Sequence, residues 1–210
     1  MKARSCTILL ATLAVLTLSG KASRSQTVVT FDDINVALTP GYATNIPTGY
    51  QGLIWSNFWV VNSILHAESV NTNGYYYGMV SPSNVAFNAG GTPAEIDSPG
   101  TNFNFLSVYL TGAWNSNLNI QVEGFDGANE IYNTIVVASA TNPTLFTFNY
   151  LDIDRLYFNS YGGQVAFGGL SETHFVMDNM TFEFIPEPSS LLLTALGLVT
   201  LWGFLGRKRT

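Results

Sequence analysis

The stretch that indicates the fold is Leu118-Asn119-Ile120-Gln121-Val122-Glu123, in which apolar and polar residues alternate without a break. Successive side chains of a β-strand point to opposite faces, so this pattern predicts a strand with one buried face and one face in water. The same alternation recurs in residues 103–105, 145–148 and 180–184. These stretches therefore predict a half-buried sheet structure.

Other β-rich runs fill much of the chain between residues 27 and 185. They lie at residues 27–31, 53–60, 74–80, 131–138, 154–159 and 164–167. Turn dipeptides separate many of these runs, among them Pro40-Gly41, Pro99-Gly100 and Asp126-Gly127. No segment of this body carries an apolar stripe of period 3.6 over three turns. We therefore predict an all-β fold, an antiparallel β-sandwich of jelly-roll type.

The composition excludes two classes of protein. The 210 residues are 47% hydrophobic and only 10% charged, which excludes intrinsic disorder as the state of the whole chain. Lys and Arg number 8 against 14 Asp and Glu, for a formal charge of −6. Binding to nucleic-acid phosphates requires a basic surface, so we expect no nucleic-acid partner.

The N-terminus has the three parts of a secretory signal peptide. Lys2 and Arg4 precede an uncharged, mostly apolar run over residues 6–18, and small residues follow from Ala22. The run is too short for a membrane span, which needs about 20 residues. We assign residues 1–25 to a signal peptide and expect export through the Sec translocon. Cys6 lies in this segment, so the mature chain would contain no cysteine and no disulfide.

The C-terminus combines a proline motif, an apolar run and a basic end. Pro186-Glu187-Pro188 leads into an uncharged run over residues 189–206, which Arg207, Lys208 and Arg209 close. The run is at the short end of the length of a transmembrane helix. Basic residues stay cytoplasmic by the positive-inside rule, so the body would lie outside the membrane. Residues 186–210 therefore predict a membrane-anchored tail.

These three parts, in this order, closely resemble the PEP-CTERM sorting signal of Gram-negative bacteria, which also carries the name ice-binding protein C-terminal domain. The resemblance implies recognition by an exosortase, with cleavage near Pro186-Glu187-Pro188. It also implies an inner-membrane precursor that is delivered to the cell envelope, the cell surface or the extracellular matrix. The ice-binding name belongs to the tail, and nothing in the body supports ice binding.

The body, residues 26–185, more loosely resembles the passenger domains of such proteins. The residues that carry this likeness are Phe31-Asp32-Asp33, 103–105 followed by Trp114, 124–127 and 174–179. The resemblance implies a jelly roll related to galactose-binding and carbohydrate-binding modules. Arg155 is the only basic residue of this body against 13 acidic ones, a formal charge of −12. Neutral glycans, or a Ca²⁺ bridge to an acidic polysaccharide, suit such a surface as partners.

Four oxygen-bearing residues at the two ends of the body are candidate ligands of a structural Ca²⁺ ion. Asp32 and Asp33 follow the first predicted strand, and Asp178 and Asn179 lie in the last. Terminal strands of jelly rolls often pair, and Ca²⁺ takes six to eight oxygen ligands. The alternative is that these side chains cap turns and strand ends.

A second candidate site is a glycan contact at Trp114, Asn115 and Asn117. Trp114 follows Gly112-Ala113, which predicts a loop between two strands where an indole ring could stack on a sugar. Trp55, Trp59 and the Tyr75-Tyr76-Tyr77 run are further aromatic candidates. The alternative is that these rings fill the core of the sandwich.

No catalytic residues are predicted. Glu123 with Asp126, and Asp152 with Asp154, have a spacing that a glycosidase could use, but a surface ion pair explains the latter pair equally well. His66 and His174, the only histidines, belong to no catalytic motif. We expect a non-enzymatic surface or matrix protein that binds exopolysaccharide. The alternatives are a secreted polysaccharide hydrolase and a structural coat protein without a specific ligand.

Overall fold

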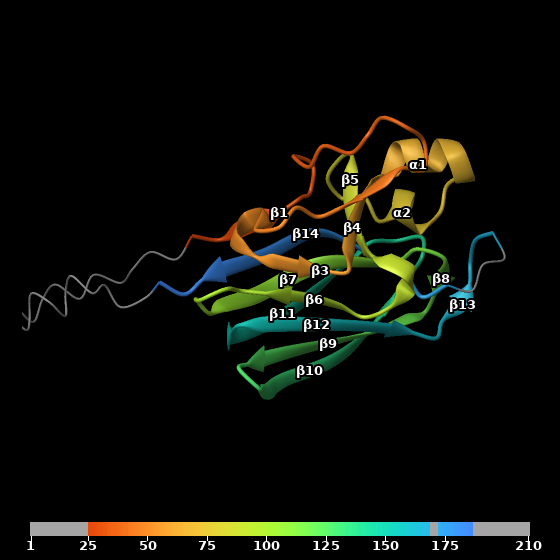
Figure 1. Ribbon diagram of the computed structural model, residues 1–210. Coiled ribbons are helices and arrows are strands. Elements are labelled where there is room, and N and C mark those ends of the chain that lie inside the picture. Colours follow the sequence, from red (N-terminus) through yellow and green to blue (C-terminus); the bar gives the residue numbers. More distant parts are fainter. Residues whose placement is uncertain (1–24, 169–171, 187–210) are drawn as a thin grey trace, which may run out of the picture.

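The computed structural model describes residues 25–168 and 172–186, and this part of the chain folds as two antiparallel sheets stacked in a sandwich (Figure 1). The larger, seven-stranded sheet has the order β11 (Thr144–Ile153), β7 (Phe103–Gly112), β14 (Phe175–Phe184), β5 (Asn84–Asn88), β4 (Phe58–Asn62) and β2 (Ala43–Asn45), with β1 (Thr27–Val29) also paired to β14. The five-stranded sheet has the order β10 (Asn129–Ala138), β9 (Leu118–Asp126), β12 (Arg155–Tyr161), β6 (Ala94–Asp97) and β3 (Ile54–Ser56). The prediction of an all-β antiparallel sandwich is confirmed.

The alternating stretch that begins at Leu118 forms β9, in the interior of the five-stranded sheet. Leu118, Ile120 and Val122 are fully buried, whereas Asn119 and Gln121 between them are partly exposed. The polar residues therefore line the outer face of the sheet and the apolar ones the inner face, as the period of two predicts.

The core between the two sheets is built largely from aromatic rings. Phe58 of one sheet makes edge contacts with Phe158 of the other and with Phe175, at centroid separations of 5.8 and 6.0 Å. Phe105 makes a further edge contact with Phe158 at 6.3 Å. Each ring buried in this way contributes about 2 kcal/mol of transfer free energy. Burial of these rings, rather than disulfide bonds, stabilises the sandwich.

The predicted strand over residues 53–60 is two strands that belong to different sheets. Asn57 interrupts the run with a left-handed φ of 59°, and its amide donates to the carbonyl of Pro93 at 2.9 Å. The chain thereby passes from β3 in the five-stranded sheet to β4 in the seven-stranded sheet. Among the described residues, four strands lie outside the stretches that the sequence pattern predicted: β2, β5, β6 and the two-residue β8 (Asn115–Ser116).

The predicted β-rich run at residues 74–80 is wrong, because its first part is the helix α2 (Gly74–Tyr77). The Asn73 side chain caps this helix by accepting from the Tyr75 N–H at 3.0 Å. Together with α1 (Ser63–Val70), it packs on the seven-stranded sheet at one end of the sandwich, α1 against β4 and α2 against β7 (Figure 1). Gly74 allows the contact with β7, since a Cβ there would lie 1.8 Å from the Gly112 carbonyl oxygen.

Three shorter elements complete the described chain. They are two single 3-10 turns, η1 (Tyr50–Gly52) and η2 (Ala89–Gly91), and a two-stranded sheet of β8 (Asn115–Ser116) and β13 (Gln164–Val165). The small sheet lies at the end of the sandwich away from the start of β1, close to the helices in Figure 1. It confirms the start of the run predicted at 164–167.

The first and last strands pair, as the sequence analysis expected. Thr27 lies opposite Phe182 and Val29 opposite Met180, so both ends of the body leave the sandwich at one end (Figure 1). Of the predicted signal peptide, residues 1–24 lie outside the described residues, as does the apolar run over residues 189–206. Within the described ranges, no helix has both the length and the apolar character needed to cross a membrane.

Candidate functional site

The outer face of the five-stranded sheet is a polar and aromatic surface. Both helices pack on the other sheet, α1 against β4 and α2 against β7. Every second side chain of β9 and β12 points outward from the five-stranded sheet. These outward residues are Asn119, Gln121, Glu123 and Phe125 from β9, and Arg155, Tyr157, Asn159 and Tyr161 from β12.

The strand register places these side chains in rows that cross the sheet. Each row has a β9 residue in the middle, with a β10 residue on one side and a β12 residue on the other. The three rows are Val137, Asn119 and Tyr161; Ile135, Gln121 and Asn159; and Asn133, Glu123 and Tyr157. Amides and tyrosines thus form one continuous surface, which we call the β9–β12 face.

Hydrogen bonds hold the amides of the β9–β12 face in place. Gln121 Nε2 donates to Glu123 Oε1 at 2.7 Å and to Asn133 Oδ1 at 3.2 Å. Asn133 Nδ2 in turn donates to Glu130 Oε1 at 2.9 Å. Fixed side chains lose less conformational entropy when a ligand binds, so the surface is preorganised.

Arg155 is the only Lys or Arg among residues 25–168 and 172–186, and its neighbours already engage it. Its Nη1 lies 3.9 Å from Glu95 Oε1, and its Cζ lies 4.0 Å from the centroid of the Phe125 ring. The cation is thus paired with a carboxylate and stacked on a ring. It offers little attraction to an anionic ligand.

Two carboxyls of this sheet have pKa values raised above their usual range. Burial raises the pKa of Asp97, the Glu95 carboxylate adds to the effect, and Arg155 opposes it. Burial likewise raises the pKa of Glu123, with Glu130 adding and Arg155 opposing. The carboxyls Glu95, Asp97, Glu123 and Glu130 nevertheless outnumber Arg155, the one Lys or Arg among the described residues, on this side of the molecule.

The sequence predicted the solvent-exposed face of β9 but not the surface that this face forms with β10 and β12. The signal was present at 155–161, where Arg155, Tyr157, Asn159 and Tyr161 alternate with buried residues. The pairing that brings Tyr157 beside Glu123 is a long-range contact, which no local pattern reveals.

Trp114 lies in the bend between β7 and β8, as predicted, but its ring is partly buried. It makes edge contacts with Tyr75 at 5.9 Å and with His66 at 6.5 Å, beside the smaller apolar cluster under the helices. Its backbone carbonyl accepts from the Ala166 N–H at 2.8 Å. The ring therefore contributes to packing of the helices on the sheet.

The two amides predicted to accompany Trp114 differ in exposure. Asn115 is 1% exposed, and its Nδ2 donates to the Gly162 carbonyl at 3.0 Å, so it holds two loops together. Asn117 is exposed in a left-handed turn with φ of 52°. The glycan contact at these residues stays a prediction.

Asp178 is a fully buried carboxylate that binds a backbone loop. Its Oδ2 accepts from the Val80 and Ser81 N–H groups at 2.7 and 2.8 Å, and its Oδ1 accepts from the Asn179 N–H at 2.7 Å. Burial raises its pKa to about 6, against the opposing effect of these hydrogen bonds. Asn179 Oδ1 also accepts from the Ser81 hydroxyl, at 3.0 Å.

The two aspartates after β1 also accept hydrogen bonds. Asp32 Oδ1 accepts from the Asn84 N–H at 2.9 Å, and Asp33 Oδ1 accepts from the Tyr50 hydroxyl at 2.5 Å. Both bonds join parts of the chain that are distant in sequence, so they differ from the local capping of turns and strand ends that the sequence left open as the alternative to calcium. Among the described residues, no three His, Cys, Asp or Glu side chains are grouped to hold a metal ion. The calcium site stays a prediction.

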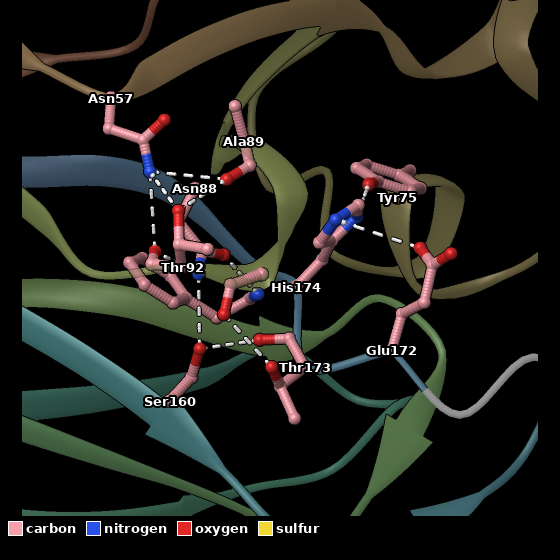
Figure 2. A network of polar contacts seen from close by, with 11 residues as sticks. Asn57, Tyr75, Asn88, Ala89, Thr92, Ser160, Glu172, Thr173 and His174 are labelled. Atoms are coloured by element: carbon pink, nitrogen blue, oxygen red, sulfur yellow. Dashed lines mark hydrogen bonds and ion pairs between the residues drawn. The ribbon is translucent and has the colours of Figure 1, made fainter.

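His174 belongs to a polar chain between the helices and the strands (Figure 2). Its Nδ1 lies 2.7 Å from the Tyr75 hydroxyl, and its Nε2 lies 3.6 Å from Glu172 Oε2. Burial lowers the pKa of His174, against the pull of the Glu172 carboxylate. Tyr75 is 3% exposed, so its hydroxyl is inaccessible to a polymer in solution. The chain fastens α2 to the start of β14.

A second polar chain in Figure 2 joins the two sheets. Asn88 Nδ2 of β5 donates to the Ser160 hydroxyl of β12 at 3.1 Å, and its Oδ1 accepts from the Phe175 N–H at 2.7 Å. The Ser160 hydroxyl donates to the Thr173 carbonyl. Buried polar groups that are bonded in this way fix the alignment of the sheets.

Asp152 and Asp154, one of the pairs considered for hydrolysis, accept hydrogen bonds near the bend between β11 and β12, whereas Glu123 of the other pair accepts from Gln121 and Asn133 on the β9–β12 face. Asp152 Oδ1 accepts from Asn102 Nδ2 at 3.0 Å, and Asp154 Oδ2 accepts from the Gly127 N–H at 2.9 Å. Asp126 ends β9 at the hairpin that leads to β10.

The sorting residues lie almost entirely outside the described chain. Pro186 is the last described residue and is exposed. Glu187, Pro188, Arg207, Lys208 and Arg209 lie beyond it. The sorting signal therefore stays a prediction from the sequence.

No family model and no curated protein matches the sequence. Solved structures with partial similarity include a DUF4465 family protein from Bacteroides ovatus, at 9% identity and a TM-score of 0.47, covering 77% of this chain and 99% of that chain. TmCBM61 in complex with beta-1,4-galactotriose matches at 11% identity and a TM-score of 0.35, over 67% of this chain and 95% of its own. CBM51 from Clostridium perfringens GH95, in complex with methyl-galactose, matches at 8% identity and a TM-score of 0.31. The match covers 74% of this chain and 99% of that chain.

Proposed function

We propose that this protein is an exported, non-enzymatic β-sandwich that binds neutral exopolysaccharide at the cell surface or in the extracellular matrix. The observation that carries the proposal is the β9–β12 face, where fixed amides lie beside tyrosines on an uncovered sheet. Amides exchange hydrogen bonds with sugar hydroxyls, and aromatic rings pack against the apolar faces of sugars.

The charges of the β9–β12 face favour an uncharged chain of sugars. Arg155 is paired with Glu95 and stacked on Phe125, while Asp97, Glu123 and Glu130 add further carboxyls nearby. A polysaccharide rich in uronate or sulfate would meet like charge here. A neutral polysaccharide meets hydrogen-bonding groups without that repulsion.

Export and sorting form the second part of the proposal, and their support is the sequence alone. The signal peptide at residues 1–25 and the PEP-CTERM-like tail at residues 186–210 would bring the chain to the Sec translocon, then to the membrane and an exosortase. The pairing of β1 with β14, the first and last strands, supports a jelly-roll topology for the body between them.

Affinity electrophoresis of the full-length chain in gels that contain neutral or acidic polysaccharides tests the binding. We expect retardation by a neutral polysaccharide, and loss of that retardation in Tyr157→Ala. Tyr42→Ala is the matched control, because Tyr42 is a 49% exposed tyrosine outside this face. Trp114→Ala tests the loop site predicted from the sequence.

Three results would reject the proposal. Equal mobility of the wild type with and without every polysaccharide would favour a coat protein without a ligand. Loss of binding in Trp114→Ala but not in Tyr157→Ala would indicate that the glycan binds at the loop that contains Trp114. Release of reducing ends from a bound polysaccharide would favour the hydrolase.

A further inference from the structure

The ten-residue strand β10 forms one edge of the five-stranded sheet. The edge of its backbone that faces away from β9 has no partner strand among the described residues. The strand order ends at β10, and only β9 pairs with it in the described chain. Backbone N–H and C=O groups on such an edge can pair with a further strand. The partner that suits this edge is therefore another β-strand.

The side chains of β10 show what kind of strand fits. Ile131, Ile135 and Val137 are 45%, 53% and 53% exposed, on a protein whose body is otherwise acidic. Glu130, near the first end, is the only charged residue of the strand. Monomeric proteins protect long edges with lysine, proline or bulges. Here the bulge lies between Glu130 and Tyr132, and the register is regular from Tyr132 to Ala138.

The other edges of the described sandwich are poorer templates. β2 and β3 have three residues each. β11 has ten residues, but its register with β7 shifts on both sides of Tyr150. In addition, the Leu151 N–H of β11 already donates to the Tyr132 hydroxyl at 3.2 Å. Residues 132–138 of β10 are uncharged and regular in register, so the same segment of a second copy matches this edge in length and in side-chain character.

We infer that two copies of this protein associate through antiparallel pairing of β10 with β10 across a two-fold axis. Centred on Ile135, the pairing places Asn133 opposite the partner's Val137 and leaves the outward side chains of both copies on one face. Glu130 then lies beyond the end of the partner's strand, so the carboxylates of the two copies stay apart. A two-fold contact uses the same surface on both copies and closes at a dimer.

The dimer would join the two β9–β12 faces into one continuous surface. The pairing itself does not depend on glycan binding, since it uses the backbone and the aliphatic side chains of β10. A polysaccharide with repeated binding units would engage both faces at once and gain avidity. The formal charge of −12 on each body opposes association, so added salt strengthens the dimer.

Sedimentation equilibrium of the full-length chain in a mild non-ionic detergent, over the micromolar concentration range, tests the inference. We expect a concentration-dependent dimer. Ile135→Lys places like charges across the axis and raises the dimer dissociation constant by about tenfold or more. Val28→Lys is the matched control, because Val28 is also 53% exposed but lies on β1, and it leaves the dimer intact.

Hydrogen exchange provides a readout that a change in folding alone would not mimic. Amides of residues 132–138 that face away from β9 exchange slowly in the dimer and faster in Ile135→Lys, while those of β14 are unchanged. A wild-type monomer at all concentrations would overturn the inference. So would a dimer that Val28→Lys disrupts and Ile135→Lys preserves, or open-ended growth into filaments.

Discussion

Asp178 gives the folded protein a pH dependence with a definite sign. Its carboxyl is fully buried, and burial raises its pKa to about 6, whereas an unfolded aspartate titrates near 3.8. Between these values the folded state holds a proton that the unfolded state has released. The free energy of unfolding therefore falls as the pH rises through this window.

The magnitude follows from the difference between the two pKa values. A difference from 3.8 to about 6, at about 1.4 kcal/mol per pH unit, corresponds to at most about 3 kcal/mol. That stability is present below about pH 4 and is lost by about pH 7. The four hydrogen bonds from Val80, Ser81 and Asn179 stabilise the charged form and oppose the effect, so the measured change is a balance of burial against hydrogen bonding.

Urea unfolding of the wild type and of Asp178→Asn at a series of pH values isolates this group. Other groups with shifted pKa values are present in both proteins, so their contributions to the pH dependence cancel in the difference. They are His66 and His174, whose pKa values burial lowers, and Asp97 and Glu123, whose pKa values burial raises. We expect the stability of the wild type relative to Asp178→Asn to decrease by up to about 3 kcal/mol from about pH 4 to about pH 7. A relative stability that increases with pH would show that the hydrogen bonds outweigh burial and would refute the reasoning.

Three further predictions concern the helices, the core and the calcium hypothesis. Gly74→Ala forces a Cβ to within 1.8 Å of the Gly112 carbonyl oxygen and displaces α2, so thermal denaturation should show a loss of about 3 kcal/mol from the unburied Tyr75 ring and the lost backbone hydrogen bond. An unchanged melting temperature would mean that α2 does not dock on β7. Phe158→Ala removes a ring that lies between the two sheets and should cost about 3–5 kcal/mol in chemical unfolding, while a cost below about 1 kcal/mol would contradict the packing. The calcium hypothesis predicts that a chelator lowers the melting temperature, and an unaltered melting curve would remove it.

The strands that the sequence predicted well are those with one wet face. In β9, and over residues 180–184 of β14, apolar and polar residues alternate for long enough to fix both the element and its orientation, whereas residues 175–178 at the start of β14 are buried on both sides and show no such alternation. β5 was missed because it is buried on both sides, so no alternation marks it. The helix α2 was mistaken for a strand because tyrosines favour strands, whereas the Asn73 cap and the small Gly74 decide the outcome locally.

The candidate site was less predictable than the fold, for a physical reason. Trp114 stood out in the sequence as a tryptophan in a loop, but exposure depends on what packs against a ring, and Tyr75 and His66 come from other parts of the chain. The β9–β12 face, in contrast, is exposed but was not conspicuous in the sequence. Its residues are ordinary in the sequence and become a surface only when the register sets Tyr157 beside Glu123.

The arrangement of the ends bears on how such a surface could be used. Because Thr27 pairs with Phe182, the chain enters and leaves the sandwich at one end, and Pro186 follows directly (Figure 1). Processing at either terminus would therefore act at that end of the molecule. The β9–β12 face and the β10 edge extend along the side of the sandwich, and α1 and α2 lie at the other end. If the chain is attached through its C-terminal tail, as we propose, the side surfaces would stay free to contact polysaccharide and a second copy, so anchoring and binding could occur together.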